Sequence, residues 1–187
     1  KRLHAQGARV LFIDDLSVGI HPDAWLGLPV SFEHKNLRIY GQDERLLFLH
    51  ADLRDVLRGL NTDPQWLAKQ YGLSIALFDD IFHFAAIVGG RSKIDGDPML
   101  VAQDLSIDAE MFLYVCRNKP RRFLYPSSSA AYPIDLQTEA HALRLKETDI
   151  DFKKMGEPDM TYGWSKLTGE FLAKIAASHY GVHVTCI

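Results

Sequence analysis

Hydrophobic and polar residues follow one another along this chain in blocks that predict alternating strands and helices. Runs rich in branched and aromatic side chains predict strands at residues 8–14, 45–53, 79–90, 121–129 and 183–187, with a weaker one at 37–40. Amphipathic segments predict helices at residues 1–6, 54–70, 98–118 and 162–179. The strand segments are apolar throughout rather than at every second position, which is typical of parallel strands covered on both faces. The pattern therefore predicts an α/β fold with a doubly wound parallel sheet.

The two ends of the sequence look like interruptions of this pattern. The chain starts, without an initiator methionine, on what reads as the back half of a helix that ends at Gly7. It stops at Ile187, inside the last apparent strand. We therefore expect residues 1–187 to form one partial domain that is truncated at both ends.

Composition and charge narrow the classes of function. Of the 187 residues, 47% are hydrophobic and 24% are charged, as in an ordinary globular domain. The net charge of −3 gives no basic footprint for nucleic acid, and no apolar run reaches the length of a membrane span. We interpret Cys116 and Cys186 as buried thiols in a reducing compartment, and we expect a cytoplasmic protein without a metal site. His83, in an apolar strand, reads as a core histidine.

The carboxyl ends of the predicted strands carry candidate ligand-binding residues, because open parallel sheets bind ligands at that edge. The first strand ends in Asp14, followed by Asp15, and the second ends in Asp52. An acid at such a position of a dinucleotide-binding unit accepts hydrogen bonds from the ribose hydroxyls of adenosine. The second acid would repel a 2′-phosphate, which favours NAD over NADP. On the third strand, Ala85 and Ala86 are small enough to let a flat cofactor approach the backbone.

The segment MTYGWSKLTGE, residues 160–170, places Tyr162 four residues before Lys166 on a predicted helix. Side chains four apart lie one above the other, so the ammonium would lie near the phenol oxygen. A nearby positive charge favours the phenolate, and lowering a tyrosine pKa from about 10 to about 7 takes roughly 4 kcal/mol. One interpretation of the pair is therefore a proton-transfer device in which Lys166 lowers the pKa of Tyr162. The same spacing also arises by chance in many helices, and then the pair has no role.

Five ordered motifs together resemble the extended short-chain dehydrogenase/reductase family, which includes nucleotide-sugar epimerases and dehydratases. The motifs are VLFIDDL, FLHADLRD, DDIFHFAA, FLYPSSSAAYP and YGWSK, and they follow the family's order over essentially the whole chain. The resemblance implies a Rossmann-type fold, NAD as the cofactor and a nucleotide sugar as the substrate.

The resemblance also implies roles for the candidate residues by their positions in these motifs. The cofactor-binding positions follow the strands: Asp14 and Asp15 at the ribose, Asp52 and Leu53 at the adenine, and Phe84, Ala85 and Ala86 at the pyrophosphate and nicotinamide ribose. The catalytic set is Ser128, Tyr162 and Lys166. Tyr162 would be the acid/base, and it would line the cofactor site together with Lys166, which would bind the nicotinamide ribose.

This chain departs from the family pattern at several places. The glycine-rich phosphate loop of the family would precede Lys1, and Asp104 stands where the family usually has Asn. Relatives that dehydrate a sugar carry an Asp–Glu pair just after the catalytic residue, where this chain has Ser129 and Ala130. GDP-sugar epimerases that resemble it carry a cysteine two residues before Tyr132, and that position is Ala130. Neither specialised reaction is supported.

The resemblance favours an NAD-dependent epimerase that acts on a nucleotide sugar through a transient keto intermediate. A first alternative is a sugar dehydrogenase or reductase with net redox turnover. A second alternative is a dinucleotide-binding sensor without catalysis. The set of Ser128, Tyr162 and Lys166 argues against the sensor, because a binding module needs no acid/base.

Two predicted helices carry more apolar surface than one sheet can cover. The positions are Trp164, Leu167, Phe171 and Ile175 on one helix and Leu105, Met111, Phe112 and Val115 on the other. The family commonly pairs these helices with their copies, so we expect a homodimer with Trp164 and Phe171 partly buried between subunits. The alternative is that residues 16–44 or a C-terminal portion covers the stripe.

Overall fold

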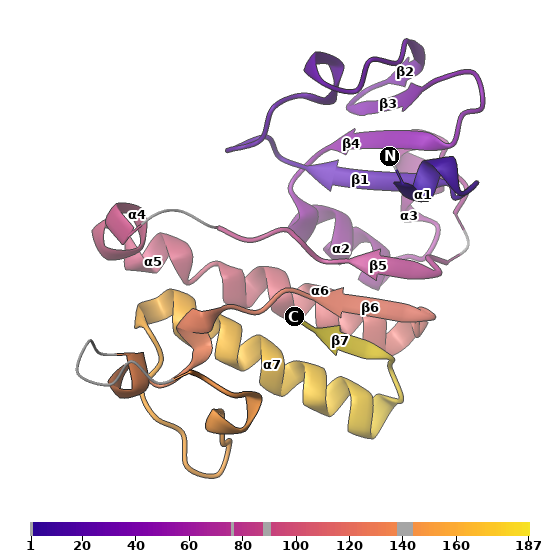
Figure 1. The fold of residues 1–187 in the computed structure, drawn as a ribbon. Helices are drawn as coiled ribbons and strands as arrows, with labels where there is room; N and C mark the ends of the chain where they lie inside the picture. Colours follow the sequence, from indigo (N-terminus) through magenta and orange to yellow (C-terminus); the bar gives the residue numbers. More distant parts are fainter. Residues whose placement is uncertain (1, 76, 88–90, 138–143) are drawn as a thin grey trace. The chain divides into compact units, whose positions relative to one another are not determined.

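The computed structural model describes residues 2–75, 77–87, 91–137 and 144–187. The chain divides into two compact units, Lys1–Ala76 and Leu77–Ile187, and each has its own sheet (Figure 1). Parallel strand pairs occur in both units, which confirms the α/β class that the sequence predicts. Among the described helices, none has the length and apolar content needed to cross a membrane.

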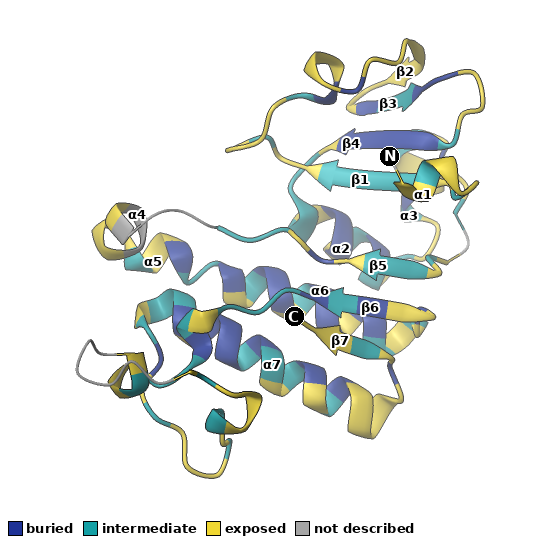
Figure 2. Ribbon diagram, viewed as in Figure 1, coloured by how far each residue is buried: buried dark blue, intermediate teal, exposed yellow. Residues whose placement is uncertain are grey.

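The sheet of the first unit has the strand order β1-β4-β3-β2. β1 (Val10–Asp14) pairs parallel with β4 (Leu46–His50), and β3 (Leu37–Tyr40) and β2 (Val30–His34) follow in antiparallel pairs. The first four residues of β4 are at most 5% exposed, as its unbroken apolar run predicts (Figure 2). Because β1 and β4 are parallel, with Asp14 opposite His50, their carboxyl ends lie at the same edge of the sheet.

The hairpin of β2 and β3 is the part of this sheet that the sequence predicts least well. The weak strand signal at 37–40 is confirmed as β3, but β2 is not predicted. All five residues of β2 are exposed, so this edge strand needs no apolar pattern in its sequence (Figure 2). Its two-residue turn contains Lys35 with a φ of 53° and no glycine, so the usual hairpin signature is absent.

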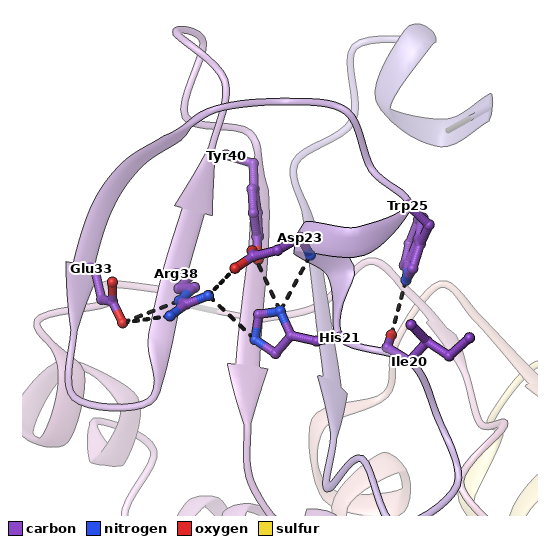
Figure 3. Close-up of polar contacts among 7 residues, drawn as sticks. All are labelled: Ile20, His21, Asp23, Trp25, Glu33, Arg38 and Tyr40. Carbon is purple, nitrogen blue, oxygen red and sulfur yellow. Dashed lines mark hydrogen bonds and ion pairs between the residues drawn. The ribbon is translucent and has the colours of Figure 1, made fainter.

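A polar network fastens the segment before β2 onto β3 (Figure 3). A short 3₁₀ turn, Pro22–Ala24, presents Asp23, which accepts a hydrogen bond from the Tyr40 hydroxyl at 2.7 Å. Asp23 also forms an ion pair with Arg38, and the Arg38 guanidinium donates to Glu33 at 3.0 Å. These contacts hold residues 21–24 at the antiparallel side of the sheet.

The helices of the first unit are α1 (Arg2–Ala5), α2 (Leu53–Thr62) and α3 (Trp66–Tyr71). The sequence predicts one helix over residues 54–70, and the structure shows two. The break falls at Asp63 and Pro64, because proline lacks the N–H that a continuing helix needs. The buried face of α2 consists of Val56, Leu57 and Leu60.

The second unit has a parallel sheet in the order β5-β6-β7. Its strands are β5 (Asp80–Phe82), β6 (Arg122–Tyr125) and β7 (Val184–Cys186). Its helices are α4 (Arg91–Gly96), α5 (Pro98–Val101), α6 (Asp104–Asn118) and α7 (Met160–Tyr180). The single helix predicted over residues 98–118 is therefore two, α5 and α6. The long helix α7 packs against α6, β6 and β7, and so lies beside the carboxyl end of the central strand.

The third predicted strand is much shorter than its apolar run, because β5 has only three residues. His83 still donates its backbone N–H to the Leu124 carbonyl at 3.0 Å. Farther on, the Ile87 N–H is bonded to the Asp104 carboxylate at 2.6 Å rather than to a strand. Residues 88–90, the last of the predicted strand, lie outside the described residues.

Two expectations about burial need correction. Cys116 is partly buried, but Cys186 is exposed at the end of β7, so the interpretation of both as buried thiols is wrong for Cys186. Four positions of the predicted dimer stripes are buried inside the second unit: Leu167, Met111, Phe112 and Val115. Trp164 and Phe171 are exposed, at 43% and 45%. Leu105 is also exposed, at 41%, so these three positions form the exposed part of the stripes.

Candidate active site

The first two turns of α7 bring Tyr162 and Lys166 together, as their spacing predicts. The Lys166 ammonium lies 5.7 Å from the centre of the Tyr162 ring and 5.2 Å from that of Tyr125. It donates a hydrogen bond to the Pro126 carbonyl at 3.1 Å, just after β6. Lys166 is only 5% exposed, so its charge acts in a medium where electrostatic interactions are strong.

Ser128 joins this pair from the carboxyl end of β6. Its hydroxyl lies close enough to the phenol to lower the pKa of Tyr162, and its oxygen accepts a hydrogen bond from the backbone N–H of Ala130 at 3.2 Å. The turn that follows packs tightly on α7, because a Cβ atom at Gly163 would lie 2.3 Å from the Ala130 carbonyl oxygen. Glycine at 163 thus allows the close approach that brings Ser128 to Tyr162.

The expected effect of Lys166 on Tyr162 is not what the structure shows. Burial raises the pKa of Tyr162 above its usual value, and the carboxyl groups of Asp104 and Asp108 add to that, while the Ser128 hydrogen bond acts in the other direction. The prediction of a lowered pKa is wrong for this structure because burial has the largest influence on the phenol, and the Lys166 ammonium lies over the ring and donates to the Pro126 carbonyl.

A buried acid lies close to this group, and motif reasoning noted it without a role. Asp104, the first residue of α6, is 1% exposed. Its Oδ1 accepts the hydrogen bond from Ile87, and its Oδ2 has no hydrogen-bond partner among the described residues. Burial raises the pKa of Asp104 to about 6. The sequence signal was an acid opening an apolar helix in a strand–helix unit.

A second buried acid, Asp108, lies one turn farther along α6. Its two oxygens are both engaged, by the Nε2 of His83 at 2.8 Å and by the Tyr125 hydroxyl at 2.7 Å. His83 is 3% exposed, which confirms its assignment to the core, although its Nδ1 has no hydrogen-bond partner in the described part of the chain. Sequence reasoning gave no sign that His83, Asp108 and Tyr125 would meet.

The predicted contacts to the pyrophosphate lie just after β5. The Phe84 side chain is 70% exposed, and Ala85 and Ala86 are partly buried. The rings of Phe82 and Phe84 are nearly parallel, with their centres 6.5 Å apart. This segment thus presents an exposed aromatic ring followed by two small side chains.

In the first unit, Asp14 is the last residue of β1 and its side chain is exposed. Its Oδ1 accepts the backbone N–H of Leu16 at 2.7 Å, and Asp15 makes the same kind of bond to Ser17 at 2.9 Å. A Cβ atom at Gly19 would lie 3.3 Å from the Asp14 Oδ2, so the glycine keeps that oxygen accessible.

Asp52 is more heavily engaged than the sequence suggested. It caps α2 by accepting the backbone N–H of Arg54 at 2.8 Å, and it forms an ion pair with the Arg54 guanidinium at 2.6 Å. The hydrogen bond from the Arg54 side chain holds the pKa of Asp52 below its usual value. Leu53 is the first residue of α2 and is partly buried. Asp52 therefore has little free capacity for an adenine.

Each unit, taken by itself, offers polar groups of the kind that a dinucleotide cofactor needs. The accessible Asp14 oxygen in the first unit fits a ribose hydroxyl, which is a hydrogen-bond donor. In the second unit, Ser128, Tyr162 and Lys166 supply a hydroxyl, a phenol and an ammonium next to one another. Each unit by itself therefore carries groups that suit the chemistry of NAD, while Asp52 already forms an ion pair with Arg54.

Comparison with known protein families establishes the family of this chain. A family model described as "NAD dependent epimerase/dehydratase family" matches residues 1–187. The chain belongs to the NAD-dependent epimerase/dehydratase family. Family membership confirms the resemblance that five motifs carried in the sequence.

Individual relatives of this epimerase/dehydratase chain are distant. GDP-mannose 3,5-epimerase of Arabidopsis thaliana is 30% identical over 105 residues, which are 56% of this chain and 27% of that protein. The UDP-N-acetylglucosamine 4-epimerase of Methanobrevibacter ruminantium matches with a TM-score of 0.63 and 21% identity, over 95% of this chain and 46% of that chain. The UDP-glucose 4-epimerase of Thermus thermophilus, solved with NAD, gives 0.64 and 18%, over 99% and 48%.

An L-threonine dehydrogenase from Cupriavidus necator has nearly the same likeness, with a TM-score of 0.61 and 16% identity over 100% of this chain and 48% of that chain. At such identities the structural matches show the fold alone. The chain spans about half the length of these solved structures.

Proposed function

We propose that this chain is the cofactor-binding and catalytic portion of an NAD-dependent enzyme that epimerises a sugar carbon of a nucleotide sugar through a transient keto sugar. The observation that carries the proposal is the cluster at the carboxyl end of β6. There Ser128 lies close enough to Tyr162 to lower its pKa, and the Lys166 ammonium lies 5.7 Å from the Tyr162 ring centre.

Each member of this cluster has a distinct role in proton transfer. The Tyr162 oxygen takes the proton from a sugar hydroxyl and later returns it, and Ser128 holds that hydroxyl by a hydrogen bond. Lys166, fixed by the Pro126 carbonyl, supplies a buried positive charge and binds a ribose hydroxyl. NAD supplies the hydride acceptor and, in its oxidised form, a positive charge that favours the phenolate. That charge matters here because burial alone raises the pKa of Tyr162.

Asp14 and Asp15 give a preference between the two nicotinamide cofactors. A carboxylate accepts hydrogen bonds from ribose hydroxyls and repels a 2′-phosphate. We expect the full-length protein to bind NAD more tightly than NADP, as measured by titrating each cofactor into it. An Asp14→Asn variant, which keeps the size of the side chain, should narrow the difference in affinity between NAD and NADP. Tighter binding of NADP by the unchanged protein contradicts the role of Asp14.

A dehydrogenase or reductase with net redox turnover is the second candidate, favoured by the likeness to an L-threonine dehydrogenase. Epimerisation is preferred because the plant relative is an epimerase and the family model includes epimerases. The catalytic turn supports hydride transfer without a further acid or base, since Ser129 and Ala130 carry no carboxylate or thiol. A sensor without catalysis has no use for the Tyr162 cluster.

The experiment incubates the full-length protein with NAD and a panel of UDP- and GDP-hexoses. Sugar stereochemistry is followed by NMR, and reduced cofactor is followed by its absorbance. An inverted carbon with no net reduced cofactor supports epimerisation. Stoichiometric reduced cofactor with an oxidised sugar supports the dehydrogenase instead. Tight NAD binding without any sugar turnover favours the sensor and overturns the proposal.

We also propose that two copies pair through the exposed part of α7. Trp164 and Phe171 are exposed there, and the Phe171 ring packs on Phe152 with centres 5.4 Å apart. Light scattering on the full-length protein should give the mass of a dimer. A Phe171→Glu variant should lower that mass, while Ser178→Glu, an exposed change farther along the helix, should not. A monomer at high concentration contradicts the pairing.

A further inference from the structure

Asp104 combines deep burial with incomplete hydrogen bonding. Its side chain is 1% exposed, and its Oδ1 accepts a hydrogen bond from the Ile87 N–H at 2.6 Å. Oδ2 lacks a hydrogen-bond partner within the described residues. A buried carboxyl group with an unsatisfied oxygen opposes folding, so stability alone does not account for an acid here. An asparagine would make the same bond to Ile87 without a charge.

The charged groups around Asp104 come from three elements packed against it. Lys166 on α7 and His83, just after β5, favour the ionised form of Asp104. Asp108 on α6 disfavours that form. Burial is the largest influence and raises the pKa of Asp104 to about 6. The acid therefore changes its charge within the pH range in which enzymes usually work.

That charge acts near Tyr162, because α6, which begins at Asp104, packs against α7, which carries Tyr162. Among the influences on this tyrosine, the carboxylate of Asp104 raises the Tyr162 pKa, as does that of Asp108. An ionised Asp104 therefore makes the Tyr162 proton harder to remove.

We propose that Asp104 is a positioning residue for proton transfer, which fixes the Ile87 backbone through Oδ1 and sets, by its own ionisation, how readily Tyr162 releases its proton. The inference rests on the proposed role of Tyr162 as acid/base. It assigns the pH dependence of that step to a carboxyl group that acts through Tyr162 and Lys166. Asp104 itself transfers no proton to the substrate in this scheme.

The test replaces Asp104 by asparagine in the full-length protein and follows Tyr162 ionisation without substrate. Tyrosinate absorbance is measured against pH, and the same curve from a Tyr162→Phe background is subtracted. We expect Asp104→Asn to move the Tyr162 titration to lower pH. On the rising limb of the pH profile, kcat/KM should increase by about three- to tenfold at fixed pH. Asp135→Asn, an exposed acid in the same unit, should move neither curve.

A second measurement needs no substitution at Asp104. In the unchanged protein with isotope-labelled tyrosine, the Tyr162 resonance should show an additional inflection as Asp104 titrates. An Asp104→Asn titration that stays in place or moves to higher pH overturns the inference, and so does a Tyr162 resonance without that inflection. A shifted Tyr162 titration in a protein that turns over no sugar supports the coupling while the proposed function fails.

Discussion

The two units of the molecule each contain an aspartate that accepts a hydrogen bond from a tyrosine hydroxyl at 2.7 Å. In the first unit Tyr40 donates to Asp23, and in the second Tyr125 donates to Asp108. Both tyrosines are fully buried, at 0% exposed. The two bonds have the same length and chemistry, and they differ in what surrounds the carboxylate.

The Asp23 carboxylate is open to water. Its side chain is 46% exposed, and it also meets Arg38 and His21 (Figure 3). The Tyr40 hydrogen bond, followed by that from Arg38, lowers the pKa of Asp23, and burial beside this acid raises the pKa of Tyr40 to about 12. Water can replace any contact that is lost, so breaking this network should cost little unfolding free energy.

The Asp108 carboxylate is closed off from water, with a side chain 4% exposed and His83 as its other contact. The ammonium of Lys166 and the half-satisfied Asp104 belong to the same buried region. No solvent is available to replace a lost donor here. The unit that carries Tyr162 therefore also contains buried charged groups whose hydrogen bonding is incomplete within the described residues. Groups with perturbed pKa values are common at functional sites, where they serve chemistry rather than stability.

The largest expected effect is on stability when the buried acid is removed. Asp108→Ala leaves the Tyr125 hydroxyl and the His83 ring without their acceptor in the core. Breaking a buried pair in this way costs about 3–5 kcal/mol of unfolding free energy. Urea unfolding of the full-length protein measures the change. A loss below about 1 kcal/mol would show that water reaches Asp108, and the contrast between the units would disappear.

The next effect has the opposite sign and depends on pH. The pKa of Asp104 is raised to about 6 in the folded chain from 3.8, so its contribution to stability is fully present below pH 3.8 and is lost as the pH rises through 6. Asp104→Asn should therefore stabilise the fold by roughly 2–3 kcal/mol at neutral pH. The gain should shrink as the pH falls from 6 to 4 in urea unfolding curves. A gain that is independent of pH would contradict the burial of an ionised Asp104.

The smallest effect comes from a matched pair of substitutions. Tyr125→Phe removes a donor from a buried carboxylate and should cost about 2–3 kcal/mol, whereas Tyr40→Phe, beside an exposed one, should cost about 1 kcal/mol. Thermal unfolding of both variants gives the difference. Equal losses would mean that exposure of the carboxylate does not decide the value of the bond.

The parts of the fold that the sequence predicts are those that bury a continuous apolar run. Such runs indicate β1, β4 and β6, and Pro64 explains why one predicted helix is two. The exposed strand β2 leaves no such signal. The apolar run of the third predicted strand also does not show where the strand ends. The end of the strand depends on which acceptor the backbone N–H of Ile87 finds. The acceptor, Asp104, is more than ten residues away.

The candidate site shows the same limit. Helical spacing and a motif are local, and they suffice to bring Tyr162 and Lys166 together. The pKa direction of Tyr162 depends on burial and on where the ammonium points, which spacing does not contain. The meeting of His83, Asp108 and Tyr125 depends on the packing of a strand end, a helix and a second strand. Long-range packing of this kind leaves no trace in a single sequence.

The central claim is that Tyr162 transfers the proton in an NAD-dependent sugar reaction. Its most direct test is the turnover of a Tyr162→Phe variant of the full-length protein with NAD and the nucleotide sugar that the panel identifies. We predict a loss of about 10²- to 10⁴-fold in kcat with little change in NAD affinity, while Tyr180→Phe, the same change at the far end of α7, leaves kcat unaltered. Near-normal turnover of Tyr162→Phe would contradict the account.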